Sequence, residues 1–489
     1  MENLSKYNET RNDDWRVDLR KSKSPKERAS VERVVMPQLD PAYRSTCNDE
    51  VNTGISEAQA VAEASRCLDC NNPQCVTGCP VGINIPKFIK NIERGEFGKA
   101  ADTLKETSSL PAVCGRVCPQ EKQCESKCIH LKMHDSPVAI GYLERFAADW
   151  QRNHDSELPP VQKPQPNGIK IAVIGSGPAG LTFAGEMAKA GFEVSVFEAL
   201  HEIGGVLKYG IPEYRLPNSI VDYEISGLKK LGVHFVTDCV VSKTISYSDL
   251  HDQGFKGVFV GSGAGFPRFM DIPGENLNGV MSSNEYLTRI NLMHAGHGGD
   301  TPVISGKTIA VIGGGNTAMD SARTAVRMGA DRVILVYRRS EAEMPARHEE
   351  VMHAKEEGVE FFTLHNPVEY LGDDNGFVKT MRVQRMELGE PDASGRRSPV
   401  PVPGAISDIA VDTVIVAVGV RPNQLVPHSI QGLDVSRRGT IVVNEESMQS
   451  SVADVYAGGD IVRGGATVIL AMGDGRRAAQ SMAAALLSK

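Results

Sequence analysis

Two stretches of the chain repeat one plan, and that plan limits the fold more than any other feature of the sequence. Each runs from a short apolar strand through a glycine-rich turn into a helix and then a second apolar strand. The first reads KIAVIGSGPAGLTFAGEMAKAGFEVSVFEA from Lys170, and the second reads KTIAVIGGGNTAMDSARTAVRMGADRVILVYRR from Lys307. Strands joined in this way lie parallel in one sheet. The repeat predicts an α/β protein with two Rossmann-like dinucleotide-binding domains.

The first glycine turn follows a strand and opens a helix, which is the setting that gives the G-x-G-x-x-G pattern its meaning. Gly175 permits the tight turn, Gly177 lets a pyrophosphate approach the backbone, and Gly180 packs the helix on the strand. Glu198 ends the second strand and is placed to accept hydrogen bonds from a ribose diol. The predicted dinucleotide contacts are Gly175, Ser176, Gly177, Pro178, Ala179, Gly180 and Glu198.

The second glycine turn has alanine in place of the third glycine, which the fingerprint permits. Its predicted contacts are Gly313, Gly314, Gly315, Asn316, Thr317 and Ala318. The following strand ends in Arg338 and Arg339, where an acid would bind the 2′-hydroxyl of NAD. Arginine instead offers hydrogen-bond donors to the 2′-phosphate of NADP. The pattern favours NADPH, and a solvated strand end is the alternative.

Three later stretches favour FAD at the first turn: EIGGVLKYGIPEYRLP, GVFVGSGAGFPR and VYAGGDIV. Their order resembles the flavoproteins with two dinucleotide domains, such as glutathione and thioredoxin reductases, in which an NAD(P)H domain interrupts the FAD domain. The resemblance implies that Asp460 binds FAD and that the helix starting near Thr467 points its dipole at the isoalloxazine. Further FAD contacts are expected at Gly205, Arg215, Gly459, Asp460, Thr467 and Val468. Tyr209, Glu213 and Arg215 are expected to shape the flavin–nicotinamide region, with no catalytic side chain assigned.

Eight of the ten cysteines lie between Cys67 and Cys128. The N-terminal residues are polar and lack the apolar core of a signal peptide, which indicates the cytoplasm, where thiols stay reduced. The candidates are therefore iron–sulfur ligands, zinc ligands or inert thiols. Zinc carries no electrons, so iron–sulfur fits a flavoprotein better. Because Cys239 is the only cysteine after Cys128, disulfide exchange at the flavin is not expected.

Composition and proline-rich stretches predict where the chain divides into domains. A net charge of −8 argues against nucleic-acid binding, and no apolar run approaches the roughly 20 residues that span a membrane. Residues 1–45 are rich in charge, and we expect a solvated or mobile arm, a docking segment being the alternative. The expected divisions are the polar arm 1–45, a helical cysteine domain 46–154, a proline-rich linker 155–168, an FAD domain 169–300 and 410–489, and an inserted NADPH domain 301–409.

Several motifs occur together from about residue 46 onward: CLDCNNPQCVTGCPVGINIP, VCGRVCPQEKQCESKC, GSGPAGL, YGIPEYRLP, GGGNTAMD, YRR with MPA, and YAGGDIVRGGATVILAMGDGRRAA. With these motifs the chain resembles the small (beta) subunit family of NADPH-dependent glutamate synthase. It is also similar to the N-terminal half of dihydropyrimidine dehydrogenase and to the large subunit of the electron-bifurcating NADH-dependent ferredoxin:NADP oxidoreductase.

The resemblance implies two [4Fe–4S] clusters whose ligands are interleaved between the two cysteine runs. One ligand in such relatives is a Gln or Glu after an I-G-x-L motif, which here makes Glu144 a candidate. Cys114 is then the doubtful cysteine. The expected ligands are Cys67, Cys70, Cys75, Cys79, Cys118, Cys124, Cys128 and Glu144.

The expected activity takes hydride from NADPH and passes electrons through FAD and the clusters to a partner. Glutamate formation needs a glutaminase, whose nucleophile would be an N-terminal cysteine. This chain begins Met-Glu-Asn and its first cysteine is Cys47, so we expect a hetero-oligomer whose large glutamine-dependent subunit makes glutamate from 2-oxoglutarate and glutamine. One alternative is the bifurcating enzyme, with a small flavin and iron–sulfur subunit as partner. Another is a non-catalytic scaffold, which the intact motifs argue against.

Overall fold

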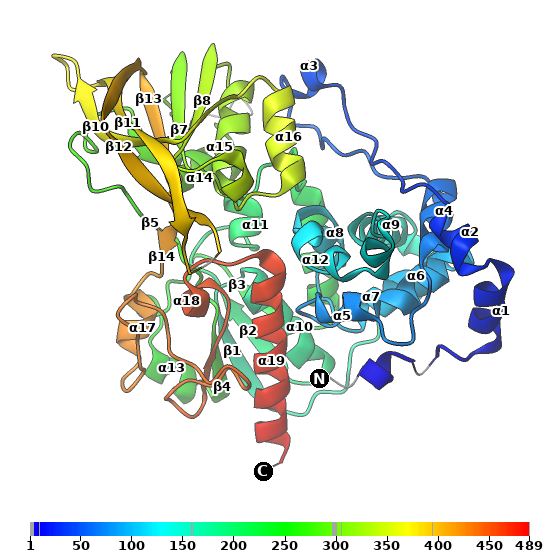
Figure 1. The fold of residues 1–489 in the computed structure, drawn as a ribbon. Coiled ribbons are helices and arrows are strands. Elements are labelled where there is room, and N and C mark those ends of the chain that lie inside the picture. The colour runs from blue at the N-terminus through cyan, green and yellow to red at the C-terminus, as the bar shows by residue number, and fades with distance from the viewer. Residues whose placement is uncertain are drawn as a thin grey trace.

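The computed structural model describes residues 4–8, 10–157, 159, 161–295, 301–304, 306–393 and 395–488. A helical domain lies beside two α/β domains, and the C-terminal helix α19 (Val468–Leu487) runs along the first α/β domain (Figure 1). Within these residues, no helix combines the length and the apolar character needed to cross a membrane.

The helical domain contains the two cysteine runs. A capping box between Ser56 and Gln59, expected from their spacing, starts α4. Two helices, α6 and α7, separate the runs and are divided at Gly95. The α-helices are α1 (Asp14–Ser22), α2 (Pro25–Ala29), α3 (Pro41–Arg44), α4 (Glu57–Arg66), α5 (Gln74–Thr77), α6 (Ile85–Glu93), α7 (Phe97–Lys105), α8 (Pro111–Val117) and α9 (Ile140–Asn153). The 3-10 helices are η1 (Leu4–Asn8), η2 (Gln120–Lys122), η3 (Glu125–Lys127), η4 (Ile129–Met133) and η5 (Asp155–Glu157).

The expectation of a solvated N-terminal arm is wrong for the residues described between 4 and 45. Helices α1, α2 and α3 lie in this segment, and Arg16, Arg28 and Arg44 are buried. Arg16 pairs with Asp69, and Arg28 pairs with Glu93 of α6. The charge that suggests solvation in the sequence is neutralised by acids far along the chain. Residues 1–3 and 9 of the expected arm lie outside the described residues, as do 158 and 160 of the expected linker.

The first α/β domain is built on a parallel five-stranded sheet with the order β15-β4-β1-β2-β3. The strand β1, KIAVI, is buried apart from its first residue, as expected for a central parallel strand. The strands are β1 (Lys170–Ile174), β2 (Glu193–Phe197), β3 (His234–Val236), β4 (Phe255–Val260) and β15 (Val455–Ala457). The helices, besides α19, are α10 (Pro178–Lys189), α11 (Val206–Tyr209), α12 (Asn218–Lys230), α13 (Tyr247–Asp252), α17 (Leu425–Ser429) and α18 (Asp460–Arg463).

The second α/β domain has its own parallel sheet, with the order β6-β13-β7-β8-β9. Its strands are β6 (Val280–Ser282), β7 (Thr308–Ile312), β8 (Arg332–Tyr337), β9 (Glu360–Thr363) and β13 (Thr413–Val416), and its helices are α14 (Ser283–Asn291), α15 (Asn316–Arg327), α16 (His348–Glu356) and the 3-10 helix η7 (Glu341–Glu343). The expected limits of 301 and 409 leave out β6 and β13. These short strands lack a glycine turn of their own, so no local signal in the sequence assigned them to the second domain. The expected boundary at 300 falls within residues 296–300, outside the described residues.

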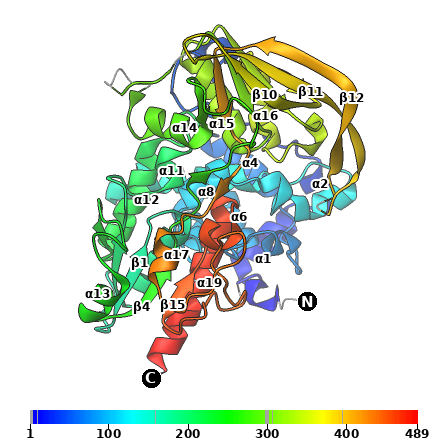
Figure 2. The same cartoon turned by 90° about the vertical axis from the view of Figure 1, so that its left-hand side faces the viewer.

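Two smaller sheets complete the fold. The long strands β10 (His365–Gly372), β11 (Val378–Pro391) and β12 (Arg397–Ala410) form an antiparallel sheet that extends from the second α/β domain (Figure 2). Where the chain passes between the α/β domains, β5 (Phe266–Pro267) pairs antiparallel with β14 (Val420–Arg421). The two crossing segments are therefore hydrogen-bonded to each other.

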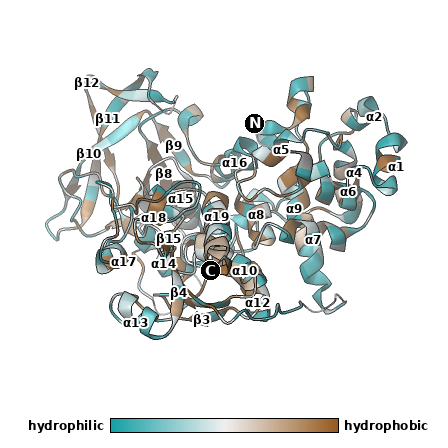
Figure 3. Ribbon diagram, turned by 90° about the horizontal axis from the view of Figure 1, so that it is seen from below, coloured by the Kyte–Doolittle hydropathy of each residue, from teal (hydrophilic) through white to brown (hydrophobic). Residues whose placement is uncertain are grey.

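The helical domain and the first α/β domain share one hydrophobic core. Buried residues such as Val113 of α8, Phe183 of α10 and Met472 of α19 belong to the same cluster. Figure 3 shows brown, apolar ribbon in the parallel sheets and polar ribbon over much of β11 and β12. A shared core fixes the cysteine domain rigidly against the first glycine turn.

Candidate functional site

A cavity of about 1700 Å³ lies where the three domains meet. Ligand sites commonly have volumes of about 300–1,000 Å³, so this cavity has room for more than one small ligand. Its wall includes the first glycine turn, the start of α15 after the second turn, and the start of α19. Val117 and Pro119, which flank Cys118 in the helical domain, belong to the same wall.

The first turn faces this cavity through five of its six residues, Gly175, Ser176, Gly177, Pro178 and Ala179. Gly180 lies behind them, where a Cβ would collide with the carbonyl oxygen of Gly175. Glu198 also lines the cavity, and its carboxylate accepts hydrogen bonds from Ser176 N (2.8 Å), Ser176 Oγ (2.6 Å) and Leu200 N (3.0 Å). Glu198 therefore fixes the turn from inside the protein.

The start of α19 forms another part of the cavity wall, next to the first turn. Thr467 caps this 20-residue helix by accepting a hydrogen bond from Leu470 N, and it lines the cavity with Val468, Gly459 and Asp460. Burial raises the pKa of Asp460 to about 6, although its carboxylate accepts a hydrogen bond from Ala466 N at 2.8 Å. Gly205 and Arg215 complete the set of expected first-domain residues that line the cavity. The helix N-terminus offers a positive dipole end to a ligand in the cavity.

The second turn reaches the cavity only through Asn316 and Thr317, while Gly313, Gly314, Gly315 and Ala318 lie outside the cavity wall. The ring of Tyr337 packs against Gly314, which brings the end of β8 beside the turn. The two expected arginines that follow β8 differ. Arg338 is exposed, whereas Arg339 is buried and donates to Asp392 Oδ2 (2.7 Å) and to the carbonyl of Arg397 (2.8 Å). Because the Arg339 side chain is bound to the start of β12 and to Asp392, the structure does not support its expected contact with a 2′-phosphate.

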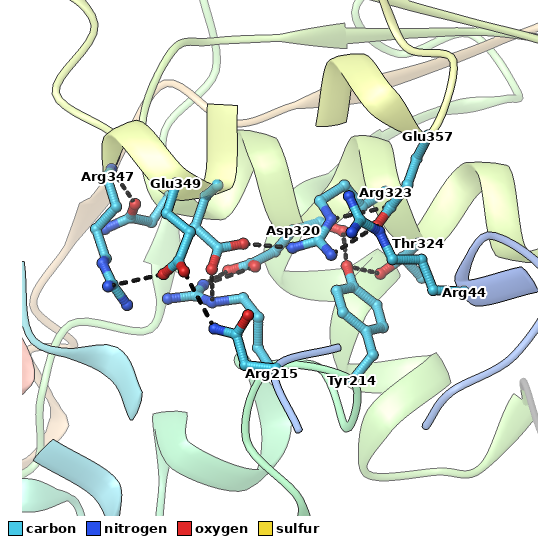
Figure 4. A network of polar contacts seen from close by, with 12 residues as sticks. Arg44, Tyr214, Arg215, Asp320, Arg323, Thr324, Arg347, Glu349 and Glu357 are labelled. Carbon is cyan, nitrogen blue, oxygen red and sulfur yellow. Dashed lines mark hydrogen bonds and ion pairs between the residues drawn. The ribbon is translucent and has the colours of Figure 1, made fainter. Parts of the chain in front are cut away.

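Between the two α/β domains lies a buried network of charges that the sequence analysis missed (Figure 4). Arg215 Nη1 donates to both carboxylate oxygens of Asp320 at 2.7 Å, and both residues line the cavity. The Tyr214 hydroxyl donates to the carbonyl of Asp320 at 3.0 Å. The sequence feature that could have revealed this network is the spacing of Asp320, Arg323 and Arg327, which places them along one face of α15.

The same network reaches the N-terminal segment. Glu357 accepts hydrogen bonds from Arg323 (2.8 and 2.9 Å) and from Arg44 Nε (3.0 Å). Burial opposes the ionisation of Glu350, but Arg215 and Arg323 lower its pKa to about 2. Burial would likewise lower the pKa of Arg215, yet Asp320 and Glu350 raise it above its ordinary value. These groups stay charged and hold the domains together.

All ten cysteines are free thiols, and those of the two runs approach one another. Helix α5, which carries Cys75, packs on η3 between Cys124 and Cys128. A Cβ at Gly78 would lie 2.6 Å from the carbonyl oxygen of Gln123, so the runs touch where only glycine fits. No group of three or more His, Cys, Asp or Glu among the described residues is spaced for a single metal ion. A four-iron cluster is larger and does not need its ligands to meet at one point.

Electrostatic coupling separates the thiols into two groups. Burial raises the pKa of Cys75, and the charges of Cys67, Cys128 and Cys70 raise it further. We call these four cysteines the first group. Burial also raises the pKa of Cys124, and the charges of Glu125, Cys79, Glu144 and Cys118 raise it further. We call Cys79, Cys118, Cys124 and Glu144 the second group. Each group thus draws on both cysteine runs.

Glu144 is the unusual member of the second group. Its Oε1 atom is buried without a hydrogen-bond partner, and burial together with Glu224 raises the pKa of Glu144 to about 8. A buried carboxylate oxygen with no donor is costly unless something else binds it. Cys114 adjoins the second group, because a hydrogen bond with Cys118, burial, and the charges of Cys118, Glu144 and Cys79 raise its pKa, but its thiol also donates to Met472 Sδ at 3.4 Å. The structure therefore gives Cys114 a protein partner and leaves one oxygen of Glu144 without one.

The two groups differ in their distance from the cavity. In the second group, Cys118 lies between Val117 and Pro119 of the cavity wall, and a Cβ at Gly473 of α19 would lie 2.9 Å from the carbonyl of Pro80, next to Cys79. All four cysteines of the first group are partly exposed, as is Cys79, whereas Cys118 and Cys124 are buried. The second group therefore adjoins the cavity wall, and the first group lies closer to the surface.

Comparison with known proteins agrees with this construction. Residues 169–475 match the pyridine nucleotide-disulphide oxidoreductases, and residues 44–156 match dihydropyrimidine dehydrogenase domain II, 4Fe-4S cluster. FprA from Mycobacterium tuberculosis in complex with NADPH has a TM-score of 0.55 at 19% identity, covering 66% of this chain and 85% of that one, which shows a common fold. The fold defines a pyridine-nucleotide oxidoreductase with an iron–sulfur domain, as the sequence predicted.

Sequence identity to known relatives identifies the family within this class of oxidoreductases. The chain is 36% identical over 459 residues to the small chain of glutamate synthase [NADPH] from Escherichia coli (strain K12), covering 92% of this chain and 97% of that one. It is 38% identical over 431 residues to the beta subunit of NADP(+)-dependent formate dehydrogenase from Moorella thermoacetica, covering 83% and 59%. The chain belongs to the family of the NADPH glutamate synthase small chain, which confirms the resemblance read from the sequence.

Proposed function

We propose that this chain oxidises NADPH at an FAD-containing cavity and delivers single electrons, through two [4Fe–4S] clusters, to a separate glutamine-dependent subunit that makes glutamate. One observation carries the proposal. A single cavity is lined by both glycine-turn regions and by the two neighbours of Cys118 in the helical domain. A site where two nucleotides meet therefore adjoins a proposed cluster ligand.

The cavity fits two dinucleotides. Its volume suffices, and the buried Ser262 Oγ on its wall has no hydrogen-bond partner in the protein, so it is free to bind a ligand. FAD would be held by the first turn, Glu198, Gly205, Gly459, Asp460, Thr467 and Val468. NADPH would be held by the second turn, chiefly through Asn316 and Thr317, with Arg338 at its 2′-phosphate.

The cysteine groups fit two clusters. The first group supplies four thiolates from Cys67, Cys70, Cys75 and Cys128, and the second supplies three, from Cys79, Cys118 and Cys124. The unpartnered oxygen of Glu144 completes the second set. Without a metal centre, burial keeps Glu144 as a neutral acid whose Oε1 has no hydrogen-bond partner, whereas a metal centre would bind the carboxylate.

The bound cofactors supply the hydride and single-electron chemistry, so the chain itself needs to bind, orient and insulate them. The hydrogen bonds from Ser176 to Glu198 hold the first turn, and the Arg215–Asp320 pair holds the second nucleotide domain against the first. The shared core holds the second cysteine group beside the cavity. We assign no acid or base, because hydride transfer between cofactors needs none. We place this activity in the cytoplasm, where the thiols stay reduced.

The nature of the acceptor rests on the relatives. The small chain of glutamate synthase matches nearly from end to end, which favours a glutamine-dependent large subunit as the partner. Another relative is the beta subunit of an NADP(+)-dependent formate dehydrogenase, which makes a formate-oxidising subunit the competing candidate for the partner. Anaerobic affinity purification of the full chain from its own cells, with mass identification of co-purifying protein, tests the choice. A large subunit with glutamine-dependent activity supports the proposal, and a small flavin and iron–sulfur subunit or a formate-oxidising subunit contradicts it.

Replacing Arg338 with Ala tests the nucleotide preference. We expect KM for NADPH to rise by about 10- to 100-fold, because a charge-assisted contact to the 2′-phosphate contributes about 1.5–3 kcal/mol. Activity with NADH should change little. Steady-state reduction of an artificial acceptor with each nucleotide measures both effects. The matched control is Arg339→Ala, which we expect to lower stability without this selective effect, and an equal loss with NADH and NADPH at Arg338 would contradict the assignment.

A further inference from the structure

The N-terminal segment clamps the loop that carries Cys67 and Cys70. Asp69 lies between these cysteines, and both its side chain and that of Arg16 are fully buried, with 0% exposure. Arg16 Nη2 donates to Asp69 Oδ1 at 2.5 Å, and Arg16 Nε donates to Oδ2 at 3.0 Å. Arg20 Nη1 adds a third bond to Oδ2 at 2.7 Å. Two guanidinium groups thus share one carboxylate.

The backbone of the loop is held from the same side. Asp69 has φ of +50°, in the left-handed region that non-glycine residues seldom adopt, so its conformation needs support. Arg11 Nε donates to the carbonyl of Asp69 at 3.0 Å, and Asn8 Nδ2 donates to the carbonyl of Asn71 at 2.8 Å. Asn8, Arg11, Arg16 and Arg20 therefore hold the side chain of Asp69 and the main chain on both sides of Cys70.

We propose that Arg16 and Arg20 are positioning residues that hold and neutralise Asp69, so that Cys67 and Cys70 can bind the surface-side cluster at its working reduction potential. This inference rests on the proposed function, because it requires a cluster on the first group. The N-terminal segment, which the sequence predicted to be a free arm, would then support the cluster from which electrons leave the protein.

The charges of Asp69, Arg16 and Arg20 predict the direction in which each substitution changes the reduction potential of the cluster. A buried carboxylate beside a cluster disfavours the added negative charge of reduction, and two paired arginines cancel that effect. Removing both arginines should lower the reduction potential of the first-group cluster or release the cluster. Removing the Asp69 charge alone should raise the potential, because the arginines remain. A purely structural role would instead make both changes damaging in the same direction.

The test uses the full chain, purified anaerobically, as R16M/R20M, D69N and R16M/R20M/D69N. The control is K99M, which breaks the exposed Lys99–Glu96 pair of the same domain, where the side chains are 60% and 44% exposed. Iron and sulfide content and EPR-monitored redox titration are the measurements. We expect a lower potential or loss of about half of the iron in R16M/R20M, a higher potential in D69N, and values near wild type in the triple variant.

Each outcome decides something. Unchanged potentials and iron in both R16M/R20M and D69N overturn the inference, as does a triple variant no closer to wild type than the double. If R16M/R20M loses the cluster outright, a lower or unchanged potential in D69N overturns it. If wild-type protein binds no cluster at Cys67, Cys70, Cys75 and Cys128, the proposed function itself fails, which is a distinct result.

Discussion

Replacing Glu144 with Ala is expected to remove the second-group cluster while leaving the first. Iron content should fall from about eight to about four atoms per chain, because Cys79, Cys118 and Cys124 alone leave one coordination position empty. Electron delivery to the partner should fall by at least about 100-fold, beyond what loss of a supporting residue causes. NADPH should still bleach the flavin, since the cavity wall remains intact. Iron analysis and anaerobic flavin spectra measure the two effects.

Cys114 provides the matched control for Glu144. Its thiol is buried and bonded to Met472 Sδ, so Cys114→Ala should keep about eight iron atoms per chain. Glu144→Gln keeps an oxygen ligand and should retain the cluster, with a higher potential because the ligand is neutral. Loss of iron in the Cys114 variant with full iron in the Glu144→Ala variant would show that Cys114, and not Glu144, is the eighth ligand.

The sequence predicted the parts of the fold whose signals are local. Both glycine turns stand between a strand and a helix, and the structure places both there. The strand β7, TIAVI, is buried after its first residue as its apolar run indicates. Short patterns of this kind are decided by neighbouring residues, so a single sequence suffices.

The parts that failed depend on partners distant in sequence. Arg16 pairs with a residue 53 positions away and Arg44 with one 313 positions away, and no local pattern marks these pairs. Arg339 looks equivalent to Arg338 in the sequence, but the neighbouring β12 and Asp392 engage it. The charged face of α15 could have been read as solvated or as buried, and only the packing of α16 decides between them.

Asp320→Ala should be among the most destabilising single changes in the chain, at about 3–5 kcal/mol. The substitution removes the Arg215–Asp320 pair and leaves the Arg215 guanidinium buried between the α/β domains with Glu350 as its remaining acid. The hydrogen bond from Tyr214 to the backbone carbonyl of residue 320 remains. Urea unfolding of the holoprotein, followed by flavin fluorescence, measures the cost. Glu360→Ala breaks the exposed Arg332–Glu360 pair, 48% and 52% exposed, and should cost less than about 1 kcal/mol.

The double variant R215M/D320M separates the charge pair from the packing around it. If the buried charges matter through their mutual compensation, replacing both with methionine should cost less than Asp320→Ala alone, because neither charge is left unpaired. KM for NADPH should nevertheless rise in the double variant, since the pair also orients α15 and its Asn316–Thr317 start toward the cavity. A double variant as unstable as the sum of the single changes would mean that the two side chains act independently, and the pair would then not join the domains.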